Sequence, residues 1–253
     1  MRYINEISLG ARLKSSASMV LDFILPARCP NCSTKITAHG FLCPNCWGDL
    51  QPLAAPFCGR CALPFEFAAE DGDECGACLL SPPDFDWARA AVSYEDLGRT
   101  LVLRLKHGAA SSVVPAMAQM MASALTGKGA DVIMPVPLHR SRLMARRFNQ
   151  SQLIAHALTG RLSVPVDSFS LIKKKPTESQ GGLNRRARFQ NVAASFAVKE
   201  GRAGHVAGKD ILLVDDVLTT GATVSACARV LKKAGAKSVG VITFARVGRP
   251  VSG

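Results

Sequence analysis

Two groups of residues in this chain have the types and spacing that binding chemistry needs. One is a set of paired cysteines near the start, and the other is a pair of aspartates near the end. Eight of the nine cysteines fall in four Cys-x-x-Cys pairs, which are Cys29/Cys32, Cys43/Cys46, Cys58/Cys61 and Cys75/Cys78. Each such turn presents two thiolates to one metal ion, and two turns complete a tetrahedral site. We therefore expect two structural zinc ions, each held by four cysteines.

The order of the cysteine pairs favours one way of joining them. Ten residues separate the first pair from the second, and thirteen separate the third from the fourth. Sequential pairing needs the least loop closure, although sequence alone leaves a crossed arrangement open. Four thiolates leave no open position on the metal, so these sites are expected to be structural. Thioredoxin-like redox chemistry is the alternative, but no βαβ pattern surrounds the pairs. The ninth cysteine, Cys227, lies on the apolar side of a helical pattern and is expected in the core.

The two aspartates lie in the stretch ILLVDDVLTTGATV, residues 211–224. The apolar run before them is typical of a strand buried on both faces, and a helical pattern follows the glycine. Asp215 and Asp216 end this run with carboxylates that are costly to bury without partners. A strand, a polar loop and a helix N-terminus together surround an anion with backbone N–H groups and the positive end of a helix dipole.

An apolar strand that ends in two acids has several uses. A nucleotide triphosphatase would hold magnesium with it, but the stretch ALTGKGAD lacks the first glycine and the hydroxyl of a P-loop. A phospho-acceptor domain would carry its acids near the chain start. In a phosphoribosyl site the Thr-Gly loop takes a 5′-phosphate, and the carboxylates accept hydrogen bonds from ribose hydroxyls. A strand end without a role in binding is the remaining alternative.

The chain divides into three parts by composition. Its 253 residues are enough for one α/β domain and a small additional unit. The first part, residues 1–28, is expected to contain an amphipathic helix over residues 4–25 that packs on the rest of the protein. Residues 29–80 hold the cysteines, have little apolar content and are expected to depend on metal for their fold. The proline-containing stretch LLSPPDF then leads into an α/β domain over residues 86–253.

Strand and helix patterns alternate in the third part. Strands are expected in residues 87–94, 131–137, 194–199, 211–214 and 238–247, with an extended stretch over 164–174. Helices are expected over residues 97–108, 113–125 and 141–160, and after Gly221. This alternation predicts a mostly parallel sheet flanked by helices, with ligands at the carboxyl ends of the strands.

The charge distribution favours anionic partners. The formal net charge is +12, and residues 139–190 contain eleven Lys and Arg against only Asp167 and Glu178. A diphosphate sugar and a nucleic-acid backbone would both use such a field, so charge does not choose between them. No apolar run approaches the roughly 18 to 20 residues of a membrane span, and we expect a cytoplasmic protein.

Three stretches together resemble a known family. ILLVDDVLTTGATV resembles the phosphoribosyl diphosphate (PRPP) signature of type I phosphoribosyltransferases. PVPLHRSRLMARRFNQS (135–151) and TESQGGLNRRARFQNVAASF (177–196), behind a double four-cysteine unit, resemble the ComF family. That family consists of cytoplasmic bacterial proteins with a double zinc ribbon and a phosphoribosyltransferase domain, linked with competence and the handling of incoming DNA. The resemblance runs from Cys29 to Arg246.

The resemblance implies roles for particular residues. Asp215 and Asp216 would hold the ribose 2′- and 3′-hydroxyls, and Lys173 to Arg188 would form a flexible catalytic loop that contains Gln180 and excludes water. We take Gln180 and Arg188 as candidate catalytic residues beside the two acids. The 5′-phosphate would bind to Thr219, Thr220, Gly221, Ala222 and Thr223. The loop that cradles the diphosphate beside Mg²⁺ would be Val136, Pro137, Leu138, His139 and Arg140.

The expected activity is phosphoribosyl transfer from PRPP, with Mg²⁺, to an unidentified acceptor. Purine-salvage members of the superfamily carry an acid at the place of Thr219, near the base nitrogen. A threonine is no general base near neutral pH, so a purine is a poor candidate for the acceptor. The alternative is a non-catalytic module that binds a nucleotide or single-stranded nucleic acid such as DNA and works with a helicase-type partner.

Overall fold

Four apolar stretches build the central sheet of the computed structural model, which describes residues 26–108, 110–146, 148–174 and 195–248. The strand order is β1-β6-β5-β2, and every neighbouring pair is parallel. These strands are β1 (Trp87–Ser93), β2 (Val132–Pro135), β5 (Asp210–Leu218) and β6 (Ser238–Arg246). Their runs of aliphatic residues fit a sheet that is covered on both faces. The strands begin at one edge of the sheet and end at the other, so the loops that follow them share the second edge.

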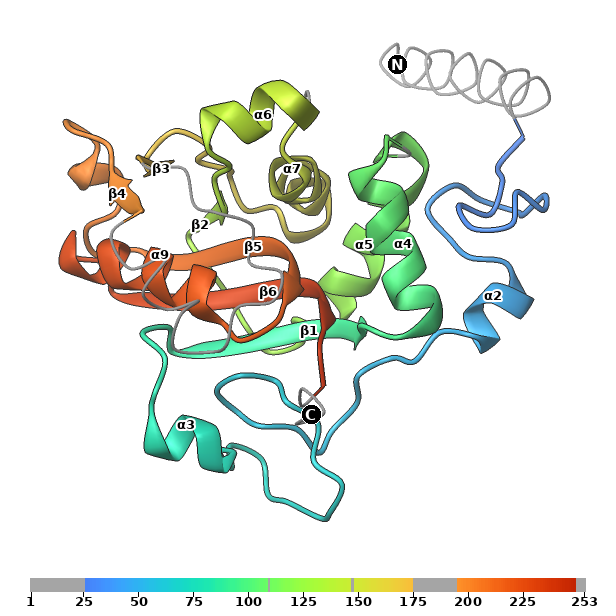
Figure 1. Cartoon of the computed structure of the whole chain (residues 1–253), viewed down its shortest axis with the longest axis horizontal. Coiled ribbons are helices and arrows are strands. Elements are labelled where there is room, and N and C mark those ends of the chain that lie inside the picture. The colour runs from blue at the N-terminus through green and yellow to red at the C-terminus, as the bar shows by residue number, and fades with distance from the viewer. Residues whose placement is uncertain (1–25, 109, 147, 175–194, 249–253) are drawn as a thin grey trace, which may run out of the picture.

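Helices cover the sheet on both faces (Figure 1). One face carries α4 (Asp96–Lys106), α5 (Ala110–Ser123) and α7 (Gln150–Leu162), and the other carries α9 (Ala222–Lys233). Alternate residues of β5 divide between the two faces: Leu212 and Val214 pack with the first group of helices, whereas Ile211 and Leu213 pack with α9. Because of this alternation, successive side chains of β5 point alternately to the α4, α5 and α7 face and to the α9 face.

A small second sheet lies on the α9 side. It pairs β3 (Leu171–Lys173) with β4 (Phe196–Val198) in antiparallel fashion, and both strands pack their first apolar residue into the α9 cluster. The extended stretch before β3 adds one parallel bridge, Ile133 to Val166, beside β2. The 3₁₀ turn η1 (Ala203–His205) follows β4.

The helix expected over residues 141–160 is two helices, so this prediction is wrong. A short helix α6 (Arg140–Arg146) ends before Phe148, and α7 begins after Asn149. Asn149 has an extended backbone, and its side-chain oxygen accepts a hydrogen bond from the backbone N–H of Ser151 at 3.1 Å. This N-cap starts a new helix, because it satisfies a donor that has no partner inside α7. Nor does Gly160 end the helix, since α7 runs on to Leu162 and ends at the left-handed Ser163.

The two cysteine-rich ribbons lie against different parts of the α/β unit (Figure 1). The first ribbon (residues 29–46, with α2, Pro44–Gly48) contacts α4, where Arg104 donates a hydrogen bond to the carbonyl of Pro30 at 3.1 Å. The second ribbon (residues 58–78, with α3, Gly76–Leu80, at its end) contacts β1, where Arg89 donates a hydrogen bond to the carbonyl of Gly59 at 3.2 Å. Each ribbon is thus hydrogen-bonded to an element of the sheet layer or its helices.

Trp87 shows how tightly β1 and β6 pack. A Cβ atom placed on Gly240 of β6 would lie 2.1 Å from the Trp87 ring, so only a glycine leaves room for the indole there. The Lys128 ammonium lies 5.5 Å from the centre of the same ring. Trp87 is therefore held between the sheet and a cation.

The fold class expected from sequence is confirmed: a parallel sheet flanked by helices follows an N-terminal pair of cysteine clusters. Cys227 is fully buried in the α9 cluster, as expected. The expected N-terminal helix, Gln180, Arg188 and most of the expected catalytic loop lie outside the described residues. Within the described ranges, each helix is too short or too polar to cross a bilayer.

Candidate zinc centres and ligand site

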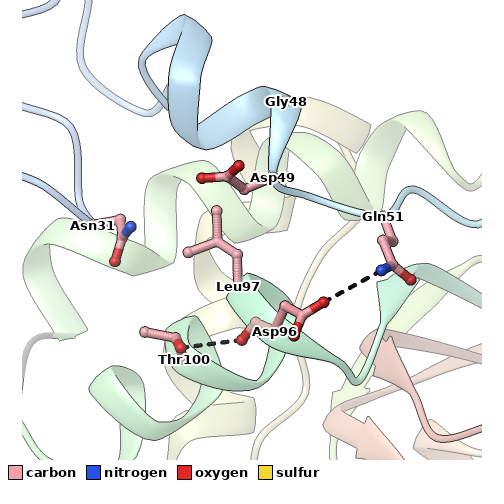
Figure 2. A pocket seen from close by; sticks show the side chains of 7 residues that line it. All are labelled: Asn31, Gly48, Asp49, Gln51, Asp96, Leu97 and Thr100. Carbon is pink, nitrogen blue, oxygen red and sulfur yellow. Dashed lines mark hydrogen bonds between the residues drawn. The ribbon is translucent and has the colours of Figure 1, made fainter.

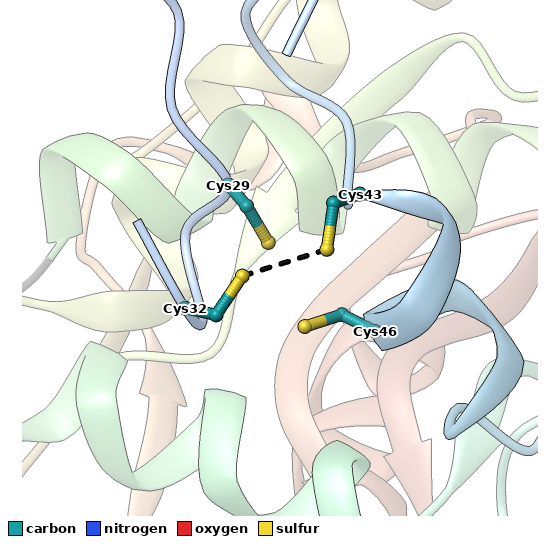
Figure 3. Close-up of side chains that lie close together, drawn as sticks. All are labelled: Cys29, Cys32, Cys43 and Cys46. Carbon is teal, nitrogen blue, oxygen red and sulfur yellow. Dashed lines mark hydrogen bonds between the residues drawn. The ribbon is translucent and has the colours of Figure 1, made fainter. Parts of the chain in front are cut away.

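The cysteine pairs join sequentially. Cys29, Cys32, Cys43 and Cys46 form one cluster, and Cys58, Cys61, Cys75 and Cys78 form the other. Within each cluster the four sulfur atoms lie within 4.8 Å of one another. Figure 3 shows the sulfurs of the first cluster converging on a common centre from two turns of the chain. The crossed arrangement left open by the sequence is thereby ruled out.

The spacing of the sulfurs fits zinc. Tetrahedral zinc–thiolate bonds put neighbouring sulfurs about 3.8 Å apart. The Cys32 and Cys43 sulfurs lie 3.4 Å apart, and those of Cys61 and Cys75 lie 3.7 Å apart. Backbone and amide N–H groups also point at the sulfurs: the Cys75 N–H donates to Cys58 Sγ at 3.2 Å, and Asn31 Nδ2 donates to Cys46 Sγ at 3.3 Å. Such bonds stabilise thiolates, so the donor sets are those of two structural zinc sites.

Asp215 and Asp216 lie inside β5, which continues to Leu218, so the strand expected to stop at residue 214 is longer than the sequence predicted. The two aspartates are held by contacts from α7 and α4. Ser151, in the first turn of α7, donates a hydrogen bond from its hydroxyl to Asp215 Oδ1 at 2.9 Å. The backbone N–H of Asp216 donates to the same oxygen at 3.0 Å. Lys106, the last residue of α4, places its ammonium 3.1 Å from Asp216 Oδ2. One acid is therefore hydrogen-bonded and the other is paired with a cation.

The environment of Asp215 makes its carboxyl hard to ionise. Its pKa is raised to about 7, first because the group is withdrawn from water and second because the negative charge of Asp216 is adjacent. The hydrogen bonds from Ser151 and from the Asp216 N–H, and the charge of Lys106, act in the opposite direction. A carboxyl poised in this range responds to any ligand that favours one of its protonation states.

The loop after β5 (residues 219–221, here the β5–α9 loop) leads directly into a helix N-terminus. Gly221 has φ +79°, a left-handed backbone conformation that favours glycine, and it is the N-cap of the twelve-residue α9. The N–H of Ala222 donates to the Thr220 hydroxyl at 3.4 Å. No acidic side chain occupies the first turn of α9. The positive end of its dipole therefore faces no carboxylate from its own first turn.

Arg246, at the end of β6, fixes the other side of this loop. Its guanidinium donates hydrogen bonds to the carbonyls of Leu218 at 3.2 Å and Thr219 at 2.8 Å. It also donates to the carbonyls of Val247 and, at 2.9 Å, Cys61 in the second ribbon. Only 9% of this arginine is exposed. The loop, β6 and the second ribbon are thus joined through one side chain.

Residues 136–140, the expected diphosphate loop, follow β2 at the same edge of the sheet as the two acids. The N–H of Val136 bonds the carbonyl of Val214 at 2.9 Å, and its own carbonyl accepts from Asn149 Nδ2 at 3.0 Å. His139 Nδ1 accepts the backbone N–H of Ser141 at 3.3 Å, and Arg140 is the first residue of α6. The first residue of the expected diphosphate loop is therefore bonded to the residue that precedes Asp215.

Sequence patterns did not single out several residues that complete this site. Lys106, Ser151, Asn149 and Arg246 reach it from three elements, α4, α7 with its N-cap, and β6. Only Asn149 carried a local signal, as a residue type that commonly caps helices. Gln150 adds a further observation, because its Nε2 is buried and is one of two buried side-chain atoms without a hydrogen-bond partner among the described residues. It neighbours Ser151, so an unsatisfied donor lies within one residue of a group that binds Asp215.

The described cavities lie away from the acid pair (Asp215 and Asp216), against the first ribbon. One cavity, of about 580 Å³, lies between this ribbon and the start of α4. Its lining residues, among them Asp49, Asp96 and Thr100, are drawn in Figure 2. A second, more apolar cavity of about 480 Å³ lies between the ribbon and α5 and includes Phe41 and Trp47. The side chains of these two aromatics are about half exposed, at 52% and 53%.

Comparisons with known proteins agree with this architecture. Residues 20–79 match the model of a double zinc ribbon domain, and residues 149–251 match that of a phosphoribosyl transferase domain. Among solved structures, a glutamine phosphoribosylpyrophosphate amidotransferase from B. subtilis shares 25% identity over 50% of this chain and 25% of its own, with a TM-score of 0.35. That overlap is too partial to support any argument about the site.

Two relatives match over almost their whole length. The DNA utilization protein YhgH of Salmonella typhimurium is 31% identical over 230 residues, which are 88% of this chain and 98% of that protein. Competence protein F of Haemophilus influenzae is 27% identical over 227 residues, which are 87% and 96% of the two chains. Since this similarity runs through both the cysteine ribbons and the parallel-sheet domain, the chain belongs to the ComF family, in which a double zinc ribbon is joined to a phosphoribosyltransferase domain.

Proposed function

We propose that this protein binds PRPP with Mg²⁺ at the carboxyl end of β5 and transfers its phosphoribosyl group to an acceptor. The observation that carries the proposal is the arrangement around the acid pair: two held carboxylates precede a left-handed glycine that opens α9. Carboxylates accept hydrogen bonds from neighbouring ribose hydroxyls, and a helix N-terminus binds phosphate. PRPP carries both ligand groups, the ribose hydroxyls and the 5′-phosphate, on one sugar.

The proposed transfer breaks one bond at the ribose C1′ and forms one bond there. The bond between the ribose C1′ and the diphosphate oxygen breaks, a lone pair of the acceptor forms the new bond to C1′, and the acceptor loses a proton. Pyrophosphate leaves with the electrons of the broken bond. The positive charge that develops on the sugar ring would be stabilised by the acid pair nearby. Bound Mg²⁺ would neutralise charge on the leaving diphosphate beside residues 136–140.

The proposal includes a catalytic loop from Lys173 to Arg188, with Gln180 and Arg188 as its candidate catalytic residues. Support comes from the position of its described start. Lys173 ends β3 with its ammonium 5.2 Å from the centre of the Phe196 ring, and the Lys174 N–H bonds the carbonyl of Ser195 at 2.7 Å. The described residues on either side of positions 175–194 are therefore paired in the small sheet, next to the α9 layer.

The names of the two relatives indicate a biological process. One is called a competence protein and the other a DNA utilization protein. We propose that the phosphoribosyl chemistry of this chain serves the same process, the use of DNA taken from outside the cell. The acceptor would then be a component that such a process supplies, and the absence of an acid at Thr219 argues against a purine base.

Titration calorimetry with PRPP and Mg²⁺ tests this function. Wild-type protein should bind, and both Asp215→Asn and Asp216→Asn should bind about ten to a hundredfold more weakly, because each loses a charged acceptor of a ribose hydroxyl. Asp210→Asn is the matched control, since Asp210 begins the same strand at its far end, where it accepts hydrogen bonds from Lys237 and Ser238. Equal affinity in all four proteins would refute the assignment.

A second candidate function is binding of single-stranded nucleic acid by the first ribbon, with a helicase-type partner acting on the same strand. The exposed rings of Phe41 and Trp47 favour it, because bases stack on such aromatics with about 1 to 3 kcal/mol each. Trp47→Ala should weaken the binding of a fluorescent oligothymidine and leave PRPP affinity unchanged. Asp215→Asn should do the reverse, since removal of a negative charge does not weaken binding to a polyanion. Unchanged oligothymidine affinity in Trp47→Ala would exclude this surface.

A further inference from the structure

Arg246 is unusual among the charged residues because it is buried and its partners are carbonyls. Four backbone carbonyls accept its N–H groups, from Leu218, Thr219, Val247 and Cys61. Its remaining terminal nitrogen lies 3.8 Å from Cys61 Sγ. In the described part of the chain, the ion pairs of arginines with carboxylates involve Arg60, Arg202 and Arg229, and none involves Arg246.

A buried guanidinium without a carboxylate needs another source of negative charge. The second cysteine cluster can supply it, because Cys61 lies beside Arg246. Four thiolates around one Zn²⁺ carry a net charge of roughly −2, and the sulfur of Cys61 is within hydrogen-bonding range of Arg246. The residues that would hold zinc in the second ribbon therefore also supply the counter-charge of this arginine. Loss of the metal would release the Cys61 sulfur from the cluster that holds it beside Arg246.

The same guanidinium determines which way the peptide groups of the β5–α9 loop face. In a planar trans peptide the C=O and the following N–H point in opposite directions. Because the carbonyls of Leu218 and Thr219 both face Arg246, the N–H groups of Thr219 and Thr220 face away from it. Backbone N–H groups that point to one side are what an anion-binding loop needs.

We propose that Arg246 is a positioning residue that couples zinc in the second ribbon to the anion-binding shape of the β5–α9 loop. The proposal rests on the function proposed above for this loop, and it adds that the ribbon nearest Arg246 controls the affinity for the 5′-phosphate. The first ribbon has no such role, because its hydrogen bond to the α/β unit is made by Arg104 on α4, away from the β5–α9 loop.

Hydrogen exchange of a peptide covering residues 216–224 tests the coupling without any ligand. In zinc-loaded Arg246→Gln the loop amides should exchange about tenfold faster or more, because charge-assisted hydrogen bonds to two carbonyls are lost. Cys78→Ser, which breaks the second cluster without removing Cys61, should accelerate the same peptide. Cys46→Ser, in the first cluster, should leave it unchanged. Arg89→Gln is the matched arginine control, since the Arg89 guanidinium donates hydrogen bonds to the carbonyls of Gly59, in the second ribbon, and Ala88, in β1.

Ligand binding gives the second readout. Affinity for ribose 5-phosphate, which carries only the sugar phosphate, should fall about tenfold in Arg246→Gln and Cys78→Ser. Affinity for magnesium pyrophosphate should stay at the wild-type value in Arg246→Gln, because residues 136–140 do not contact the arginine. A general loss of stability would lower both affinities together and would overturn a positioning role.

The outcomes separate this inference from the proposed function. Wild-type protein that binds neither PRPP nor ribose 5-phosphate would refute the function, while the exchange experiment would still decide the coupling. Loop exchange that is the same in Arg246→Gln as in wild type would overturn the coupling. So would equal acceleration in Cys46→Ser and Cys78→Ser, because the two clusters would then be equivalent.

Discussion

The ammonium of Lys106 lies 3.1 Å from a carboxylate oxygen of Asp216, so the last residue of α4 pairs with the second acid at the end of β5. The pair is partly buried, with side-chain exposures of 27% for the lysine and 15% for the aspartate. It places a positive charge against one of the two adjacent carboxyl groups. Lys106 is therefore part of the site, although it lies more than a hundred residues earlier in the chain.

Lys106→Gln should shift the pH dependence of ligand binding. Loss of the cation removes one influence that lowers the pKa of Asp215, so this pKa should rise further above its ordinary value. PRPP binding that requires the ionised acid should then set in at higher pH than in wild type. Calorimetry between pH 6 and 9 measures this shift. Lys128→Gln is the control, because Lys128 lies over Trp87 instead of the acid pair. Identical profiles for both variants would contradict a role for Lys106.

Asp215→Asn should weaken PRPP binding and yet stabilise the ligand-free protein at neutral pH. Both hydrogen bonds to this side chain end on Oδ1, and asparagine keeps that acceptor. The folded-state pKa of Asp215 is about 7, against 3.8 for an ordinary aspartate. Between these values the folded state holds a proton that the unfolded state has released, so the free energy of unfolding of wild type falls as pH rises through this window.

The stability gain of Asp215→Asn should therefore be absent near pH 4 and present above pH 7, on the order of 1 to 4 kcal/mol. Urea unfolding at a series of pH values measures it. Asp210→Asn should show no such gain, because the pKa of Asp210 is lowered by its hydrogen bonds with Lys237 and Ser238. A pH-independent difference between wild type and Asp215→Asn would show that burial does not raise the pKa of this carboxyl.

Gly221→Ala should cost about 1 to 2 kcal/mol of stability and weaken PRPP binding. The cost comes from the left-handed backbone, since an added Cβ would meet the Phe85 ring only at ordinary contact distance, 3.5 Å. Gly160→Ala is the matched control. Gly160 lies inside α7 with open space around its Cα, so alanine should stabilise by about 0.5 to 1 kcal/mol. Thermal unfolding compares the two, and stabilisation by both substitutions would speak against strain at Gly221.

The purified protein should contain two zinc ions for each chain, and each cluster should be lost separately. Cys29→Ser should remove the zinc of the first ribbon only, and Cys58→Ser that of the second, because the two ligand sets share no residue. Metal analysis of freshly prepared protein gives the count. A single zinc in wild type, or loss of both in either variant, would disagree with two independent sites.

Local spacing explains what could be predicted from the sequence. The zinc ligands come in pairs with two residues between them, and the acid pair lies two residues before its loop and helix, so short stretches contained both motifs. The pairing of residues across the fold was not predictable in this way. Ser151 and Asp215 are 64 residues apart, and Cys61 and Arg246 are 185 residues apart. Only the packing of α7 on the sheet, and of the second ribbon on β6, brings these partners together.

The break between α6 and α7 shows the limit of periodicity. The apolar pattern from residue 141 onwards continues through Phe148 without an obvious stop, so it predicted one helix. Asn149 prevents this, because its side chain caps α7 while its amide group bonds the carbonyl of Val136. A contact with the β2 loop therefore outweighs the local helical preference. The resulting N-terminus of α7 is what allows Ser151 to meet Asp215.

The positions of the two tryptophans give the molecule separate optical reporters. Trp47 lies on the first ribbon with half its surface in solvent, whereas Trp87 is packed over Gly240 in the sheet beneath the charge of Lys128. Their emission should therefore differ in wavelength and in accessibility to a dissolved quencher. Iodide should quench Trp47 strongly and Trp87 weakly, so fluorescence from one protein sample follows the first ribbon and the sheet as two distinguishable signals, with no added label.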